Sequence, residues 1–326
     1  MKITAVVAAI AGVALHLFAS VPVHAQAFPE KPLTLLVGFA PGGAADSVAR
    51  SLALELSREL GQQVVVDNRS GASGNIATQA LLRAPADGHT LLFAAIHFAT
   101  NPGIGGVPYD PLKDLTMVSQ ITSVPVVMLA NAQGPLKLPA DVIAASKKAS
   151  GGLRVGSGGI ATSSHLAMEL FARSQNVPFL HVPYRGGAPA NQALMAGDVD
   201  IMFDLMSGSL KGMVDGGRLR AITVMQEKRI PALPGVKSAE ELGLPATTFI
   251  RSWQGIAVRS GTSPAVVAKL HRAILAAAAT PAFKAAIDQL GSTVVTSATP
   301  DDFQKFYLAE LARWGALIKA ANIKAE

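Results

Sequence analysis

The chain has 326 residues, half of them hydrophobic, and 28 Lys and Arg against 22 Asp and Glu give a formal net charge of +6. This length predicts two domains with sizeable cores. The lack of cysteine excludes disulfides, thiolate chemistry and Cys-ligated metal sites. The basic residues are scattered and do not alternate with aromatic ones, a pattern that does not favour nucleic-acid binding.

Residues 1–25 look like a secretory signal peptide. Lys2 precedes an apolar run over 3–20, and Val23 and Ala25 are small residues at the spacing typical of a cleavage site. We expect cleavage after Ala25, which leaves a mature chain with a net charge of 6 − 1 = +5. The alternative is an uncleaved membrane anchor, for which the run is marginal in length. No later segment of the sequence is long and apolar enough to span a bilayer.

The mature chain begins with alternating strands and helices. Residues 31–40 are a near-continuous apolar run, typical of a buried parallel strand. Apolar residues at helical spacing predict a helix over 47–60 that ends at Gly61. We then expect a second strand over 62–68, a loop and a short helix over 71–84, and a turn and a third strand over 85–95. This β-α-β-α-β order predicts a parallel sheet with right-handed crossovers.

Two longer segments flank a second set of alternating elements. Gly and Pro predict a loop over 101–115. Residues 116–132 form an apolar run long enough to cross between two domains near Pro125, and 248–258 is a candidate for a second crossing strand. Strands and helices alternate between them over 153–159, 162–176, 178–187, 188–197, 198–204, 207–217 and 218–225.

Helix caps mark most of the remaining elements. Ser238 and Glu241 have the spacing of a capping box. In the C-terminal part, which is mostly helical, Ser263, Thr280 and Thr299 each stand before a Pro at the first position of a predicted helix.

The order of these elements predicts an α/β protein with two lobes. Residues 26–124 together with 251–326 would form the first lobe, and 125–250 would be inserted as the second. Two crossing strands between the lobes would act as a hinge beside a cleft.

Three Gly-Gly pairs each stand between a predicted strand and a predicted helix, namely Gly42-Gly43, Gly158-Gly159 and Gly186-Gly187. Ligands of open parallel sheets bind beyond the carboxyl ends of the strands. The free N–H groups of a helix N-terminus favour anions, and glycine lets a ligand approach the backbone. Each pair alone is more often a tight turn, and with three such pairs a site for anions becomes an equal alternative. Asp46, at the third helical position after Gly43, is expected to cap its own helix by reaching back.

Polar side chains cluster near the second and third of these pairs. One hydroxyl at the start of the helix over 162–176 is expected to be its N-cap, and the others could donate to a carboxylate. His165 could equally be a structural histidine. The Arg185 guanidinium could hold a carboxylate through two parallel hydrogen bonds, or Arg185 could be a solvated surface residue. Asp204 could accept from a ligand amine or a water, or cap the next helix.

Common catalytic motifs are missing from the sequence. There is no G-x-x-x-x-G-K-[ST], G-x-G-x-x-G or H-E-x-x-H, and the nearest approach to G-x-S-x-G has Asn75 in place of the last glycine. A hydrolase that uses Ser157, Ser163 and His165 remains an alternative hypothesis.

The sequence nevertheless resembles a known family. The segments over 28–50, 64–94, 181–204 and 216–225 are similar to those of the Bug family, the periplasmic solute receptors of tripartite tricarboxylate transporters. The resemblance runs from about Phe28 to the C-terminal helices. It implies a type II-like venus-flytrap receptor in the periplasm, without catalysis, cofactor or metal, that binds small organic acids or amino acids. Membrane transporter subunits would be its partners, or alternatively a sensor protein, and we expect a monomer.

The resemblance also implies which loops hold the ligand. In the first lobe these are Phe39, Ala40, Gly42, Gly43, Asp46, Ser73 and Asn75. In the second lobe they are Ser157, Gly158, Thr162, Ser163, His165, Tyr184, Arg185, Gly186, Gly187 and Asp204.

One stretch departs from the family pattern. Where the family often has Gly, Ser or Thr before Asn-Pro, this chain has Ala94, Ala95 and Ile96, which carry no hydroxyls, followed by the bulky His97. We therefore add His97 to the candidate ligand-binding residues. The stretch would suit a more apolar or aromatic acid, or an acid that contacts a histidine.

Overall fold

The computed structural model describes residues 28–105, 107 and 109–324, so the predicted signal sequence lies outside the described residues. Of the unit Met1–Glu30, only residues 28–30 are described, and the Phe28–Pro29 peptide bond is cis. Lys31–Glu326 is a separate compact unit in which helices and strands alternate, which confirms the predicted α/β class.

The first three strands are parallel, as predicted. β1 (Leu33–Val37) lies between β2 (Val64–Asn68) and β3 (Thr90–Ala95). Its apolar side chains are buried on both faces, which explains the continuous apolar run. The helix α2 (Ala44–Leu60) follows β1 and ends at Gly61, whose φ of 66° is left-handed. The short helices η1 (Ala72–Gly74) and α3 (Asn75–Arg83) precede β3.

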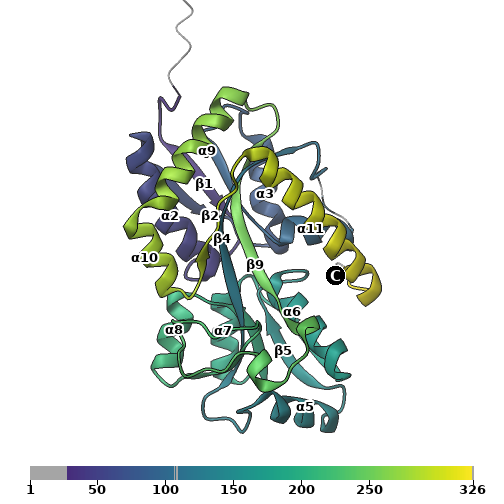
Figure 1. Cartoon of the computed structure of the whole chain (residues 1–326). Helices are drawn as coiled ribbons and strands as arrows, with labels where there is room; N and C mark the ends of the chain where they lie inside the picture. The colour runs from purple at the N-terminus through teal and green to yellow at the C-terminus, as the bar shows by residue number, and fades with distance from the viewer. Residues whose placement is uncertain (1–27, 106, 108, 325–326) are drawn as a thin grey trace, which may run out of the picture. The chain divides into compact units, whose positions relative to one another are not determined.

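The long predicted strand is a single strand of 17 residues, β4 (Leu115–Asn131). Its first part pairs antiparallel with β9 (Arg251–Arg259), and the two strands lie side by side in Figure 1. Its second part pairs with β7 (Ile201–Leu205) and β8 (Leu219–Val224). The change of partner falls at Pro125, opposite the first residue of β9. The lobe boundaries themselves stay a prediction.

The second half of the sheet repeats the parallel arrangement. β5 (Leu153–Ser157) lies between β6 (Phe179–Pro183) and β7, and the full strand order is β2-β1-β3-β9-β4-β7-β5-β6. β8 and β10 (Thr293–Val294) pair with β4 beside this path. The helices of this half are α5 (Pro139–Lys148), α6 (Ser163–Gln175), α7 (Gly187–Ala196) and α8 (Gly208–Asp215).

The C-terminal helices begin where the capping signals predict. In α9 (Pro264–Ala279), α10 (Pro281–Gln289) and α11 (Pro300–Ala321), the preceding Ser or Thr hydroxyl accepts a backbone N–H of the first turn. The capping box is also present before η2 (Glu240–Leu242), and a second short helix, η3 (Ala246–Thr248), follows. Among the described helices none is long and apolar enough alone to cross a membrane, although the bent pair α9 and α10 passes on length and composition.

One prediction was wrong. Residues 101–104, expected in a loop, belong to α4 (His97–Ile104), which contains Pro102. Proline cannot donate a backbone hydrogen bond to the carbonyl four residues earlier. Here the hydroxyl of Tyr307 in α11 donates to that carbonyl, the oxygen of Phe98, at 3.0 Å. The helix is therefore sustained by a residue more than 200 positions away.

Candidate functional site

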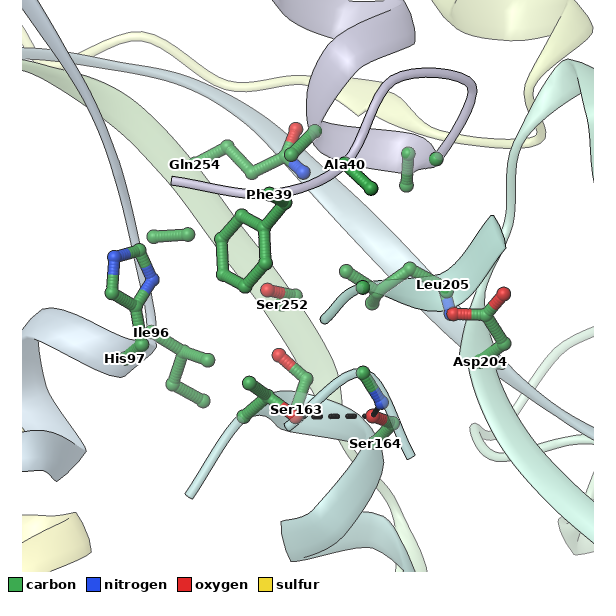
Figure 2. A pocket seen from close by; sticks show the side chains of 18 residues that line it. Phe39, Ala40, Ile96, His97, Ser163, Ser164, Asp204, Leu205, Ser252 and Gln254 are labelled. Atoms are coloured by element: carbon green, nitrogen blue, oxygen red, sulfur yellow. Dashed lines mark hydrogen bonds between the residues drawn. The ribbon is translucent and has the colours of Figure 1, made fainter. Parts of the chain in front are cut away.

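Loops that follow five strands line one pocket, with about 530 Å³ free of protein atoms. Phe39 and Ala40 follow β1, His97 follows β3, Gly158 follows β5 and Gly186 follows β6, while Leu205 ends β7. Figure 2 shows Phe39 in the middle of the pocket, with His97 and Asp204 on opposite sides of it. The pocket therefore lies at the carboxyl ends of both sets of parallel strands.

The three glycine pairs converge on one end of this pocket. A Cβ atom built on Gly43 would lie 4.0 Å from the backbone nitrogen of Gly187, and one built on Gly158 would lie 3.4 Å from the same nitrogen. We call Gly43, Gly158 and Gly187 the glycine end. The helices α2 and α7 begin here, Gly158 belongs to the loop before α6, and the first N–H groups of a helix have no acceptor within it. The arrangement favours an anion.

Asp46 caps α2 as predicted and does not line the pocket. Its Oδ2 accepts the Gly42 N–H at 2.9 Å and the Arg50 Nε–H at 2.9 Å, and its Oδ1 accepts from Asn68 at 3.0 Å. Burial opposes its ionisation, but these hydrogen bonds outweigh it and hold the pKa of Asp46 below the ordinary value. Both carboxylate oxygens of Asp46 thus have hydrogen-bond partners within the protein. Gly43 and the first two residues of α2 line the pocket instead.

Asp204 does line the pocket, beside the glycine end. Its oxygens accept from Asn191 Nδ2 at 2.7 Å and from the Leu205 N–H at 2.8 Å. Burial raises the pKa of Asp204 to about 7, although both hydrogen bonds act in the opposite direction. It does not cap the next helix, because Ser207 is the N-cap of α8 and accepts from the Leu210 N–H.

Two further polar side chains line the pocket, His97 and Gln254, and we call this pair the His97 end. His97 is 1% exposed, its ring stands edge-on to Phe39 at 5.0 Å between centroids, and burial lowers its pKa to about 3. Gln254, on β9 opposite Ala95 of β3, is fully buried. Its Oε1 accepts from Thr122 Oγ1 at 2.9 Å. Among the described residues, neither His97 Nδ1 nor Gln254 Nε2 has a hydrogen-bond partner.

Between the two ends the lining is mainly apolar, with Phe39, Ile96 and Leu205 as its largest members. Among the described lining residues, only His97 and Asp204 are ionisable and none is lysine or arginine. The described part of the chain contains no cluster of three His, Asp or Glu side chains that could hold a metal ion. Recognition of an anion here would depend on backbone N–H groups and hydroxyls.

The predicted hydroxyl cap of α6 is wrong. Thr162 occupies the N-cap position, but its hydroxyl donates to Gly159 O at 2.7 Å instead of capping the helix. Ser164 Oγ accepts the Gly158 N–H at 2.8 Å, and Ser157 Oγ accepts the Gly159 N–H at 3.1 Å. These hydroxyls hold the glycine loop in shape. Ser163, which lines the pocket, makes no side-chain hydrogen bond to the described residues.

Ser157 and His165 are buried away from the pocket. His165 Nδ1 accepts the Ala161 N–H at 3.0 Å, and its ring stacks on His181 with centroids 3.8 Å apart. Ser157 is hydrogen-bonded to His181 Nε2 at 2.6 Å, not to His165. Burial, and then the neighbouring His165, lower the pKa of His181 to about 3. The set of Ser157, Ser163 and His165 that a hydrolase would need is therefore not assembled.

Three predicted residues, Ser73, Tyr184 and Arg185, line a neighbouring pocket with about 520 Å³ of free space, and the Arg185 side chain is exposed. Gly42 and Asn75 line neither pocket, and the Asn75 oxygen accepts from Asn101 at 3.0 Å. Ten predicted residues line the main pocket: Phe39, Ala40, Gly43, His97, Gly158, Thr162, Ser163, Gly186, Gly187 and Asp204.

Eight lining residues were not predicted, namely Ala44, Ala45, Ala95, Ile96, Ser164, Leu205, Ser252 and Gln254. Six of them adjoin a predicted residue along the chain, so widening each loop by one or two positions would have found them. Ser252 and Gln254 alternate along β9 and reach the pocket only because β9 pairs with β3. No local signal marks them.

Direct hydrogen bonds join the segments after β1, β2 and β3 to those after β5, β6 and β7. Ala40 N donates to Arg185 O at 3.3 Å, and Ser73 Oγ donates to Ile160 O at 2.8 Å. Thr100 Oγ1 donates to Ala161 O at 2.5 Å, and Ser209 Oγ donates to Gly42 O at 2.5 Å. The loops are thus held together around the pocket.

Comparison with known sequences finds one family and several relatives. The model of the tripartite tricarboxylate transporter family receptor matches residues 48–323. The chain is 36% identical over 321 residues to a UPF0065 protein in the tcbD-tcbE intergenic region of Pseudomonas sp. strain P51. This match covers 97% of this chain and 94% of the relative. It is 34% identical over 307 residues to protein BugT of Bordetella pertussis, with 93% of each chain covered.

Solved structures agree. The periplasmic binding protein BugD superposes with a TM-score of 0.86 at 32% identity, covering 92% of this chain and 100% of BugD. MatC of Rhodopseudomonas palustris with bound malate gives 0.82 at 30% identity, covering 89% and 100%. R. palustris Rpa4515 with adipate gives 0.85 at 31% identity, covering 91% and 99%. These likenesses confirm the predicted periplasmic-binding-protein fold. The chain therefore belongs to the tripartite tricarboxylate transporter receptor family, whose Bug and TctC members are periplasmic solute-binding receptors and not enzymes.

Proposed function

We propose that this chain captures a small carboxylate in the main pocket and delivers it to the membrane subunits of a tripartite tricarboxylate transporter. The observation that carries the proposal is the convergence of Gly43, Gly158 and Gly187, which brings the N-termini of α2 and α7 and the glycine loop before α6 to one spot. The carboxylate would accept hydrogen bonds from backbone N–H groups there. The hydrolase alternative is not retained, because the family is one of receptors.

Capture would involve closure of the two predicted lobes. Residues 26–124 with 251–326 would move against 125–250 about the point where β4 changes partner, next to Pro125. The four hydrogen bonds between the loops would form on closure, together with those to the ligand. Removal of water strengthens each charged hydrogen bond that the ligand makes. A sensor that presents the closed form to a signalling protein would use the same pocket.

The proposed location follows from the family and from the sequence of residues 1–25. We propose that these residues direct export and are removed, so that the mature receptor acts as a monomer in the periplasm. Mass determination of the exported protein would test the cleavage after Ala25, and sedimentation would test the monomer.

The carboxylate site can be tested with one substitution. Gly43 has an ordinary φ of −82°, and an added Cβ would meet no atom closer than 3.8 Å, so Gly43→Asp should fold. Its carboxylate would occupy the place proposed for the ligand. The wild-type chain from residue 26 should gain roughly 2.7 kcal/mol of stability at 100 times the dissociation constant of a good ligand, and Gly43→Asp should lose this gain.

The matched control is Gly235→Asp, since Gly235 is exposed and an added Cβ there would meet nothing within 4 Å. This variant should bind like the wild type. Thermal unfolding against a panel of mono-, di- and tricarboxylates and amino acids gives the readout. Unchanged binding by folded Gly43→Asp would exclude the glycine end as the carboxylate site.

A further inference from the structure

The His97 end holds two buried polar groups that the protein leaves without partners. His97 is 1% exposed and Gln254 is 0% exposed, and within the described residues His97 Nδ1 and Gln254 Nε2 have no acceptor or donor. Buried polar groups in proteins are nearly always hydrogen-bonded, and leaving one unpaired is costly. Both groups belong to residues that line the pocket, so a bound molecule can supply the missing partners.

The two side chains come from neighbouring parts of the backbone, and Figure 2 shows His97 to one side of the Phe39 ring and the Gln254 amide above it, beside Ala40. Ala95 of β3 pairs with Gln254 of β9, and His97 follows Ala95 by two residues. The other ring nitrogen of His97 is directed at Gly74, where a Cβ would come within 2.6 Å of Nε2. The ring is therefore fixed, with Nε2 against the backbone of Gly74. Figure 2 shows His97 on the side of Phe39 away from Asp204.

The His97 end carries no positive charge that would stabilise a second anionic group of the ligand. Burial keeps His97 neutral, because its pKa is lowered to about 3, and the Gln254 amide has no charge. No lysine or arginine is present among the described lining residues. A carboxylate buried here would lose its water without gaining a cation. A hydroxyl, carbonyl or amide group would instead satisfy His97 and Gln254 at little cost in desolvation.

We propose that the His97 end recognises an uncharged hydrogen-bonding group, so that the ligand is a monocarboxylate with a short apolar or aromatic body and a neutral polar group at its far end. The carboxylate would occupy the glycine end, and the body would lie along Phe39, Ile96 and Leu205. The inference rests on the proposed function above. MatC and Rpa4515 have been seen with malate and adipate, which are diacids. His97 and Gln254 would therefore set a different specificity in this chain.

Matched ligands that differ only in the far group test this proposal on the wild-type chain. One set is adipamate, adipate and hexanoate, and a rigid set is 4-carbamoylbenzoate, terephthalate and benzoate. Calorimetry at pH 7.5 should show each half-amide binding about tenfold or more tighter than the diacid and than the unsubstituted acid, as expected for one or two hydrogen bonds to buried partners.

Variants then assign the recognition to named atoms. Gln254→Met keeps the length of the side chain and removes the amide, so adipamate should fall to the affinity of hexanoate while hexanoate itself is unchanged. His97→Asn places a nitrogen near the position of Nδ1 and should keep part of the preference. His97→Gln places one near Nε2 and should lose it. A merely structural role would weaken all ligands together.

The outcomes separate the two proposals. If adipate or terephthalate binds as tightly as its half-amide, the inference about the His97 end is wrong and the proposed function stands. If no carboxylate of either set, nor of the wider panel, binds the wild-type chain, the proposed function itself fails. The comparison of ligands on the wild type decides the question even if a His97 variant does not fold.

Discussion

The two ends of the pocket present different parts of the polypeptide to the space between them. At the glycine end the backbone itself faces the pocket, because Gly43, Gly158 and Gly187 carry no side chains. At the His97 end two side chains line the pocket, and the backbones of β3 and β9 are paired with each other. A backbone site does not depend on which side chains are present, while a side-chain site changes with each substitution of its residues.

The difference also appears in how each end treats charge. The glycine end offers helix N-termini, which favour a negative charge, and places Asp204 beside them with a carboxyl whose pKa is raised to about 7. The His97 end offers neutral groups only. The two ends can therefore be perturbed separately.

The largest effect is expected from the titration of Asp204. Its pKa is about 7 in the folded chain and 3.8 ordinarily, so the folded state holds the proton more tightly. The resulting stability is complete below pH 4 and is lost as the pH rises to about 7. The loss should be on the order of 4 kcal/mol, because one pKa unit corresponds to about 1.4 kcal/mol. Denaturant unfolding at intervals between pH 4 and 8 measures it.

Asp204→Asn is the control for this titration. Asn191 Oδ1 has no partner among the described residues, so the Asn191 amide can rotate and accept from the new side chain. The variant should fold and should lack the part of the pH dependence that belongs to Asp204. Equal slopes for the variant and the wild type between pH 4 and 7 would show that Asp204 ionises normally.

A middle-sized effect is expected from closing the glycine end with a methyl group. A Cβ on Gly187 would lie 2.5 and 2.6 Å from the two oxygens of Asp204, so Gly187→Ala must displace the carboxyl or the start of α7. Overpacking of this kind costs about 1–3 kcal/mol. Affinity for hexanoate and for adipamate should fall by the same factor, because both use the glycine end.

Gly212→Ala is the matched control, since Gly212 lies within α8 and an added Cβ would meet nothing within 4 Å. It should leave both affinities unchanged. If Gly187→Ala alters the ratio of the two affinities and not their common level, the glycine end is not where the shared carboxylate binds.

The same contrast explains which parts of the site could be predicted from the sequence. A glycine pair between a strand and a helix is a local signal, and so is an acid at the third helical position. The convergence of the loops and the capping by Asp46 therefore followed from short stretches of chain. His97 was found because it departs from the family pattern at a known place.

Gln254 could not be predicted, because it reaches the pocket through the pairing of β9 with β3, and Ala95 and Gln254 lie 159 positions apart along the chain. The helical turn at Pro102 was missed for the same kind of reason, since the compensating hydroxyl of Tyr307 comes from α11. Local chemistry predicts loops and caps, whereas contacts between distant elements need the fold.

The smallest effect is expected at Thr122, which positions Gln254 without touching the ligand. Its hydroxyl donates to Gln254 Oε1 at 2.9 Å, and both side chains are fully buried. Thr122→Val removes this bond and leaves the amide free to rotate, with a loss of about 1 kcal/mol in stability. Affinity for adipamate should fall a few-fold, and affinity for hexanoate should not change.

Thr116→Val is the control for Thr122→Val, because Thr116 lies on the same strand, does not line the pocket and contacts Ser260 at 3.5 Å. It should leave both affinities at the wild-type level. If Thr122→Val weakens hexanoate and adipamate equally, the hydroxyl supports the pocket as a whole and does not orient the Gln254 amide. A selective loss would show that the His97 end depends on a contact one residue removed from the ligand, which the backbone-built glycine end does not require.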